Sequence, residues 1–265
     1  MKIKKLKDPL LVEAKYYRDN RQFAEALATL HRLSAKYPDH VSLLYLLAST
    51  YYESGNEDEA IAYCDKAIEK DNLCKEAYEL KSILLKRKGD YAESEKNLLH
   101  TLELDPEMHQ ARKHLIGLYY FYLKDYEKSE EHCVYMLRHR DPDRDSMPRR
   151  KKVKVLDWIL LISNMYLSTL IQLKKYREGA ELWENLMAFS LSLTDDPSIY
   201  LSEHSKIYKL YYLAGDEENR KKKYNYLREF YGMSEREIKE GEEYVDRKGG
   251  LPVMIKEPDI LYTYE

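Results

Sequence analysis

The sequence has little glycine and proline, with 9 and 8 residues respectively among 265. β-Sandwiches and β-propellers place both residues in their many turns. A chain with so few of them is a poor candidate for either architecture. Long apolar runs are also missing, since no stretch approaches the roughly 20 residues that a membrane-spanning helix needs.

An excess of charge of one sign is absent as well. Lysine and arginine number 44 and aspartate and glutamate 47, so the formal net charge is −3. A field strong enough to hold nucleic acid is therefore not a property of the whole chain. The start of the chain alternates lysine with isoleucine and leucine and lacks the apolar stretch of a secretory signal. We expect a soluble cytoplasmic protein.

Cysteine is sparse, and its spacing excludes the common cysteine-based sites. The three cysteines are Cys64, Cys74 and Cys133, and no two are spaced as CxxC. An odd, scattered set favours buried thiols in a reducing compartment over disulfides or zinc ligands.

Catalytic and cofactor-binding motifs are missing too. No glycine-rich phosphate loop, HExxH sequence or recognisable nucleophile turn occurs. His109 and His114 are five residues apart and do not share a helix face, and His132 and His139 have no third ligand near them. We therefore expect no metal, no cofactor and no enzymatic activity.

What the sequence has in abundance is tyrosine, 26 residues against 4 Phe and 2 Trp, together with an internal period of 34 residues. Small residues recur at intervals of 34, 34 and 35 in two columns, which are Ala14, Ala48, Ser82 and Gly117, and Ala26, Ala60, Ser94 and Ser129. Larger residues recur with the same intervals in two more, which are Tyr17, Tyr51, Leu85 and Tyr120, and Leu30, Cys64, Leu98 and Cys133. Several columns that share one period indicate a repeat architecture.

Each unit has the pattern of two helices joined by a short turn. In the second unit, one helix face carries Leu44, Leu47, Ala48 and Tyr51 at the spacing i, i+3, i+4 and i+7. Turns are predicted at equivalent positions, at residues 20–21, 55–56, 89–90 and 124–125. A lone helical hairpin cannot bury both of its faces, so the units are expected to stack.

These features resemble the tetratricopeptide repeat (TPR) family. The units at 41–74 and 75–108 match its pattern best, in "YLLASTYYESGNEDEAIAYCDKAIEKDN" and "KGDYAESEKNLLHTLELDP", and the units at 7–40 and 110–142 match as well. The resemblance implies an all-α, right-handed superhelical solenoid of about six TPR-like helical hairpins. A C-terminal helix and an extended tail would follow.

Beyond residue 142 the register changes, and local patterns predict the organisation. The expected segments are four regular units at 7–142, a basic linker at 143–154, two divergent hairpins at 155–232, a capping helix at 233–250 and an extended apolar tail at 251–265. Ser234 and Glu237 form a capping-box pattern at the start of that helix. The tail is apolar enough that we expect it to pack along the solenoid or to dock on a partner.

In TPR proteins the first helices of successive hairpins line a concave groove that holds ligand peptides, and the resemblance implies the same here. Partner-binding residues are then expected on the helix face away from the packing stripe. They are Lys15, Tyr45, Ser49, Tyr52, Ile83, Lys86, His114, Phe121, Asn164, Lys209 and Tyr212. Tyrosine suits such a surface because it combines a large contact area with few rotatable bonds and a hydroxyl. Tyrosines in the repeat columns are expected to pack between repeats instead.

Some members of the family hold a partner's C-terminal carboxylate in a clamp of lysine, asparagine and arginine side chains. The corresponding positions of the first three units here are Leu11, Lys15, Leu46, Glu76 and Leu80. They do not reproduce the clamp, so a chaperone-type carboxylate clamp is not expected.

The leading functional prediction is a non-catalytic protein–protein interaction adaptor or assembly scaffold that binds a peptide or protein partner in the groove. The alternative is a module for nucleic acid or an anionic membrane surface, using the basic segments at 2–7, 149–154 and 220–223. Such binding would weaken steeply with salt. The small net charge favours solubilising segments over this alternative. Association of the chain with itself is a further possible interaction.

Overall fold

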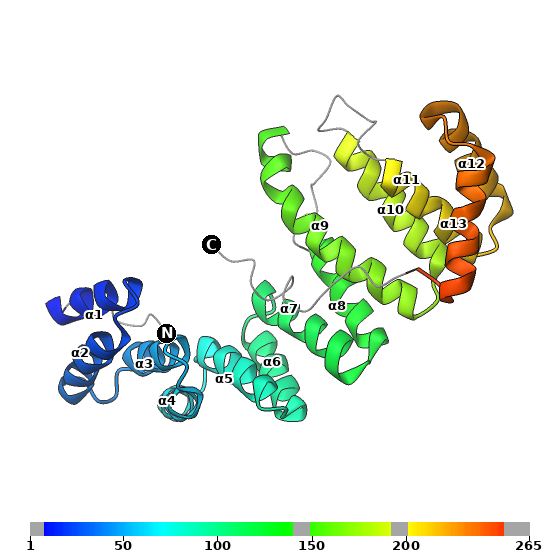
Figure 1. Ribbon diagram of the computed structural model, residues 1–265. Helices are drawn as coiled ribbons and strands as arrows, with labels where there is room; N and C mark the ends of the chain where they lie inside the picture. Colours follow the sequence, from blue (N-terminus) through cyan, green and yellow to red (C-terminus); the bar gives the residue numbers. More distant parts are fainter. Residues whose placement is uncertain (1–7, 140–148, 192–200, 252–265) are drawn as a thin grey trace. The chain divides into compact units, whose positions relative to one another are not determined.

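The computed structural model describes residues 8–139, 149–191 and 201–251, and for residues 149–158 only the backbone. Within these ranges the chain forms thirteen α-helices and one π-helix and no β-strand (Figure 1). Its contacts divide it into two compact units, Met1–Leu118 and Tyr119–Glu265. The predicted all-α helical-repeat fold is confirmed.

The first unit consists of three helical hairpins and the helix that follows them. Its helices are α1 (Pro9–Asp19), α2 (Phe23–Lys36), α3 (Val41–Glu53), α4 (Glu57–Lys70), α5 (Lys75–Arg87), α6 (Tyr91–Leu104) and α7 (His109–Gly117). Each hairpin packs on the next element through its second helix, since α2 contacts α3, α4 contacts α5 and α6 contacts α7 (Figure 1). The helices α3, α5 and α7 begin at a constant interval of 34 residues.

The turns inside the hairpins need a left-handed backbone. Gly55 and Gly89 adopt φ angles of 86° and 83°, a conformation that glycine enters without the clash that a Cβ would cause. Arg21 and Lys124 occupy the equivalent turns at φ angles of 59° and 56°. All four residues lie at the turn positions predicted from the repeat.

The small-residue columns form the close contacts between helices. Ala48 and Ala60 have no exposed surface, and Ser82 and Ser94 are equally buried. The hydroxyl of Ser94 donates a hydrogen bond to the carbonyl oxygen of Ser82 at 2.9 Å, so its polar group is satisfied inside the core. Leu47 is also completely buried beside them. The predicted packing columns are confirmed at these positions.

A π-helix takes up one extra residue in the fourth repeat. The second helices α4, α6 and α8 (Tyr126–His139) begin at Glu57, Tyr91 and Tyr126, so the last interval is 35 residues. Between α7 and α8 the chain forms η1 (Leu118–Leu123), a π-helix, which holds more residues per turn than an α-helix. The change from an interval of 34 to 35 therefore falls after α7.

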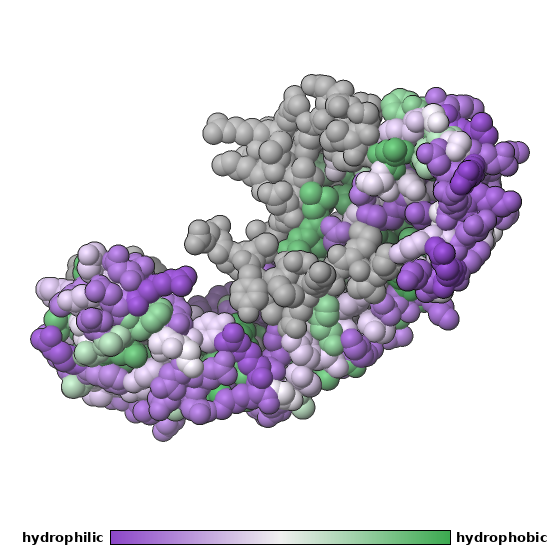
Figure 2. Space-filling model, in the orientation of Figure 1, coloured by the Kyte–Doolittle hydropathy of each residue, from purple (hydrophilic) through white to green (hydrophobic). Residues whose placement is uncertain are grey.

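The second unit adds five further α-helices to α8. They are α9 (Arg149–Gln172), α10 (Tyr176–Leu191), α11 (Leu201–Leu213), α12 (Glu217–Tyr231) and α13 (Glu235–Lys248). The main core cluster joins Leu167 of α9, Trp183 of α10 and Leu210 of α11. Gly179 of α10 allows close packing, because a Cβ at this position would lie 3.0 Å from Leu167 Cδ1. In Figure 2 the visible surface over α12 and α13 is almost entirely hydrophilic, as their charged sequences require.

Two boundaries of the second unit refine the sequence analysis. Helix α9 begins at Arg149, so residues 149–154 of the predicted linker are helical; they contain no proline or glycine, and lysine and arginine are good helix formers. Helix α13 begins after the predicted capping box, in which the Glu237 amide donates to Ser234 Oγ and the Ser234 amide donates to a Glu237 carboxylate oxygen.

Several predicted segments lie wholly or partly outside the described residues. They are the basic segment 2–7, residues 143–148 of the linker and residues 252–265 of the tail. Leu251, the first residue of the tail, is described, and it packs against the core cluster of α9, α10 and α11.

The cysteines behave as predicted. Cys64, Cys74 and Cys133 are free thiols in buried positions. Burial raises the pKa of Cys64 to about 12, and it raises the pKa values of Cys74 and Cys133 as well. A thiol that stays protonated at neutral pH is a poor nucleophile. These residues therefore serve the packing of the core.

Candidate functional site

The predicted binding face of the first unit is carried by α3, α5 and α7. Because these helices begin 34 residues apart, Tyr45, Glu79 and Lys113 occupy the same register position on successive helices. Burial, followed by the negative charges of Glu79 and Glu76, raises the pKa of the Tyr45 phenol. The face therefore places an aromatic, an acidic and a basic side chain side by side.

Glu79 lies at the centre of this face and is poorly solvated. Its side chain is 13% exposed, and one carboxylate oxygen is 3.8 Å from His114 Nε2. Burial and the neighbouring charge of Glu76 raise the pKa of Glu79 to about 7, although Lys113 and Lys75 act in the opposite direction. Its Oε1 atom has no hydrogen-bond partner among the described residues. Glu79 is therefore a proton-exchanging group near neutral pH.

His114 stays uncharged beside it. The residue is 6% exposed, and burial together with the nearby charges of Lys86 and Lys113 lowers its pKa to about 3. Within the described part of the chain, its Nδ1 atom has no hydrogen-bond partner. A neutral imidazole at 3.8 Å from Glu79 does not form a charged pair with it.

Two lysines make the same region basic. Lys86 is 7% exposed and Lys113 is 2% exposed, which is unusual burial for lysine. Burial lowers the pKa of Lys113 to about 8, while Glu79 partly offsets this effect. The four groups Glu79, Lys86, Lys113 and His114 are thus electrostatically coupled in one buried cluster.

The remaining predicted residues of the first unit surround this cluster or lie apart from it. Ser49 on α3 donates its hydroxyl to the carbonyl oxygen of Leu46. The guanidinium carbon of Arg87 lies 5.3 Å from the centre of the Tyr52 ring, a cation–π contact. Ile83 on α5 is partly buried, and Lys15 on α1 is exposed. No contact among the described residues joins Lys15 to the cluster.

Phe121 and Asn164 lie in the second unit. Phe121 belongs to η1 and packs edge-on against Tyr120, with ring centres 4.9 Å apart. Asn164 on α9 donates its side-chain amide to the carbonyl oxygen of Leu160. Both side chains are partly buried, and neither is joined by a described contact to the other predicted residues of this unit.

Lys209 and Tyr212 on α11 come together against α13. Tyr212 donates its hydroxyl to Asp246 at 2.8 Å, and Tyr208 on the same helix donates to Glu242. Both bonds join residues 34 positions apart, so α13 continues the repeat. The Lys209 stem lies against Gly241, where a Cβ would be 2.9 Å from Lys209 Cε. Burial lowers the pKa of Lys209.

Lys113 belongs to this face, although the sequence predicts His114 in its place. The prediction of His114 applies the 35-residue interval to α7, whereas α7 keeps the interval of 34. The column of Tyr45 and Glu79, extended by the strict period, would have found Lys113. The structure brings both residues to Glu79, since His114 is its neighbour at 3.8 Å and Lys113 shifts its pKa.

The described part of the chain has neither a cluster of metal-binding side chains nor a membrane-spanning helix. In these ranges no group of three or more histidine, cysteine, aspartate or glutamate side chains could hold a metal ion. No helix in the same ranges is long and apolar enough to cross a membrane.

The chain resembles several solved structures in fold. The Naa15/Naa10 complex bound to HypK-THB contains a chain with a TM-score of 0.62 and 17% identity, covering 91% of this chain and 34% of that one; this chain therefore spans about a third of its length. The C-terminal part of a TPR repeat-containing protein from Cytophaga hutchinsonii gives a TM-score of 0.57 at 17% identity, covering 89% of this chain and 86% of the other.

A third similar structure is YrrB, described as a TPR protein with an unusual peptide-binding site. It has a TM-score of 0.52 and 13% identity, and the match covers 73% of this chain and 88% of the YrrB chain. No curated protein matches the sequence. The tetratricopeptide repeat family model matches residues 11–73, which cover most of the first hairpin and all of the second. This match assigns residues 11–73 to the tetratricopeptide repeat family, and the hairpins that follow at the same 34-residue interval have the same fold.

Proposed function

We propose that the chain is a non-catalytic adaptor or assembly scaffold that binds a peptide or protein partner on the face formed by α3, α5 and α7. The TPR fold generally mediates protein–protein interaction, and YrrB is a TPR protein with a peptide-binding site. The observation that carries the proposal is the shared register of Tyr45, Glu79 and Lys113 on three successive helices.

The chemistry of this face supports recognition of a partner. Tyr45 and Tyr52 supply ring surface on α3, and Ile83 adds an apolar side chain on α5. Aromatic anchors contribute most of the binding energy in many interfaces, and the surrounding charges orient the partner. The coupled cluster around Glu79 would fix that orientation.

The basic segments support the alternative function less well. In the described segment at 220–223, Arg220 pairs with Glu217 at 2.9 Å, Lys222 with Glu218 at 2.7 Å and Lys223 with Glu184 at 2.8 Å. Cations that are already paired with carboxylates offer little net charge to phosphates. The basic segment of α12 therefore favours a solvated helix surface.

The proposal is tested by comparing the proteins that bind the wild-type chain with those that bind the variant Tyr45→Ala/Tyr52→Ala. Tyr16→Ala is the matched control, because Tyr16 is 63% exposed on α1 and lies outside the predicted face. We expect the double variant to lose partners that the control retains. Identical partners for all three proteins would contradict the proposal.

Loss of fold is separated from loss of binding by a second variant. Ser49→Arg adds a bulky charge to the face and leaves the aromatic side chains in place. Circular dichroism and urea unfolding establish that each variant is folded. The alternative function would be favoured instead if the chain bound nucleic acid or anionic vesicles and if this binding disappeared between low and physiological salt.

A further inference from the structure

A slot lies between α4 and α6 of the first unit. It has a volume of about 620 Å³, and its lining includes Ile68 of α4, Tyr78 and Lys81 of α5, and Asn97 and Leu99 of α6. Sites that hold side chains or small ligands commonly fall in the range of about 300–1,000 Å³. We call it the α4–α6 slot.

The α4–α6 slot is separate from the proposed binding face. Successive residues of an α-helix are rotated by about 100°, so Lys81 of the slot lies nearly opposite Glu79 on α5. A ligand in the slot and a partner on the face would therefore contact different sides of the same helix.

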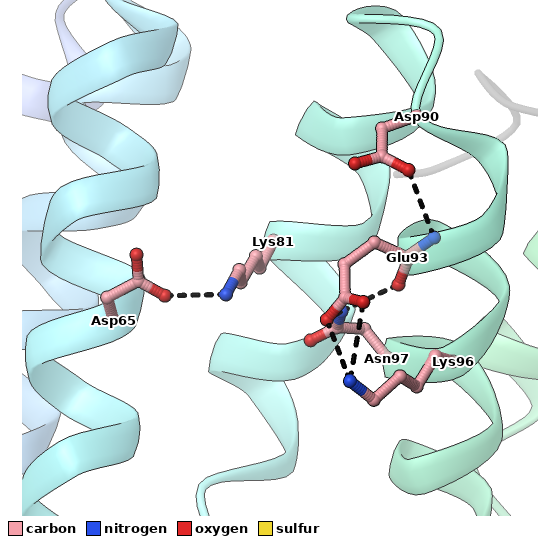
Figure 3. Close-up of polar contacts among 6 residues, drawn as sticks. All are labelled: Asp65, Lys81, Asp90, Glu93, Lys96 and Asn97. Carbon is pink, nitrogen blue, oxygen red and sulfur yellow. Dashed lines mark hydrogen bonds and ion pairs between the residues drawn. The ribbon is translucent and has the colours of Figure 1, made fainter.

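Polar side chains of the slot are held against its walls (Figure 3). Lys81 reaches across to Asp65 on α4 at 2.7 Å. On α6, Asn97 Nδ2 donates to the carbonyl oxygen of Glu93 at 2.6 Å, and Lys96 lies 3.3 Å from the Glu93 carboxylate. In Figure 3, Lys81 points toward Asp65, and the side chains of α6 point toward one another.

The slot also offers ring and apolar surface. Tyr78 and His100 meet edge to face, with ring centres 4.6 Å apart and an angle of 73° between the planes. Leu99 is 39% exposed, which is high for a leucine in this protein. An incoming aromatic ring could pack on this surface in the offset or edge-on geometry that such rings prefer.

One repeat earlier, Tyr63 holds the position equivalent to Asn97 of the slot, and it belongs to a cluster of aromatic rings. His31 of α2, Tyr51 of α3 and Tyr63 of α4 meet there: the two tyrosine rings stack at 5.4 Å, and Tyr51 forms a hydrogen bond with His31 at 2.7 Å. The ring centres of His31 and Tyr63 are 6.0 Å apart.

The α4–α6 slot lacks these rings because the sequence changes at the three positions. One period of 34 residues after His31, Tyr51 and Tyr63 stand Asp65, Leu85 and Asn97. None of the three replacements is aromatic. Asn97 lines the slot, whereas Asp65 and Leu85 are not among its lining residues. At this wall of the slot, the repeat therefore has asparagine where the preceding unit has tyrosine.

We propose that the α4–α6 slot is a second binding site, which accepts an aromatic side chain flanked by basic residues on a partner peptide. The aromatic side chain would take the place that Tyr63 holds one repeat earlier. The lining contains three glutamates, Glu93, Glu95 and Glu103, against the two lysines Lys81 and Lys96. Lys96 pairs with Glu93, Lys81 pairs with Asp65 beside the slot, and His100 contacts Glu103, so the carboxylates still outnumber the lysines. Flanking arginine or lysine complements this excess of negative charge.

The test uses the full chain and the probe acetyl-Arg-Tyr-Arg-amide, followed by NMR signals of the Ile68 and Leu99 methyl groups. We expect saturable shifts of both signals. Acetyl-Arg-Ala-Arg-amide should bind at least about tenfold more weakly, since it lacks the ring. Acetyl-Glu-Tyr-Glu-amide should also bind more weakly, because its charges face the slot's glutamates.

The matched variant copies the aromatic cluster of the preceding repeat, Asp65→His/Leu85→Tyr/Asn97→Tyr. It should remain folded, because the chain already builds this stack, and it should no longer bind the probe. Asn97→Tyr alone serves if the triple variant does not fold. The absence of saturable shifts in the wild type, equal affinity for the alanine probe, or unchanged binding by a folded filled variant would each overturn the proposal.

Discussion

The buried histidine beside Glu79 should make the protein sensitive to mild acid. His114 has a pKa of about 3 in the folded chain, against an ordinary value of 6.5. A histidine whose pKa is lowered by folding contributes stability that is present above its unfolded pKa and is lost as the pH falls. The unfolded chain takes up a proton at this side chain in mild acid, and the folded chain does not.

The size of the effect follows from the two pKa values. At about pH 5 the proton on His114 stabilises the unfolded chain by roughly 2 kcal/mol relative to the folded chain, and at about pH 7.5 by close to zero. The substitution His114→Gln removes this term because glutamine does not titrate. Between the two pH values, wild type should therefore lose roughly 2 kcal/mol more stability than the variant.

Urea unfolding at both pH values, followed by far-UV circular dichroism, measures the difference. His139→Gln is the control, because His139 is an exposed histidine on α8. The constant cost of removing a buried imidazole cancels, since only the change with pH is compared. If the stability difference between wild type and His114→Gln is the same at both pH values, the burial of a neutral histidine beside Glu79 is refuted.

Two further predictions concern a buried carboxyl and a helix cap. The pKa of Glu79 is raised from 4.5 to about 7, so the folded chain loses stability as the pH rises through this window. Relative to wild type, the free energy of unfolding of Glu79→Gln should therefore increase by about 2 kcal/mol between about pH 5 and pH 8, as measured by urea unfolding. A relative increase as the pH falls instead would contradict the prediction. Ser234→Ala removes the hydroxyl that accepts a hydrogen bond from the Glu237 amide at the start of α13, and it should destabilise this helix by about 1 kcal/mol. Faster amide hydrogen exchange in α13 measures the loss, and Ser202→Ala on α11 is the control.

The repeat could be predicted from the sequence because it depends on local chemistry. The turn at Gly55, the small residues at Ala48 and Ala60 and the capping box at Ser234 each follow from the conformational preferences of nearby residues. Their recurrence at a fixed interval made the stacking of hairpins predictable as well.

The site was predicted less completely, because its properties arise between repeats. Tyr45 and Ile83 are predicted on one face by helical periodicity together with the groove orientation that the TPR resemblance implies. Lys113 was missed because the extra residue of the fourth repeat lies in η1, after α7, and a count of sequence intervals cannot place an insertion within a unit. Helical periodicity predicts Lys209 on the face, and only the packing of α13 brings Gly241 against its stem.

The sequence by itself therefore determined the helices, their turns and the 34-residue order in which they pack. Only the tertiary structure decided which charged side chains lose water and which spaces stay open. The pKa values of Glu79 and His114 depend on burial by other helices, and the α4–α6 slot is lined by side chains from three helices, with Asn97 at the position that Tyr63 holds one repeat earlier. Local preferences act over a few residues, whereas desolvation and packing depend on every group that the fold brings near.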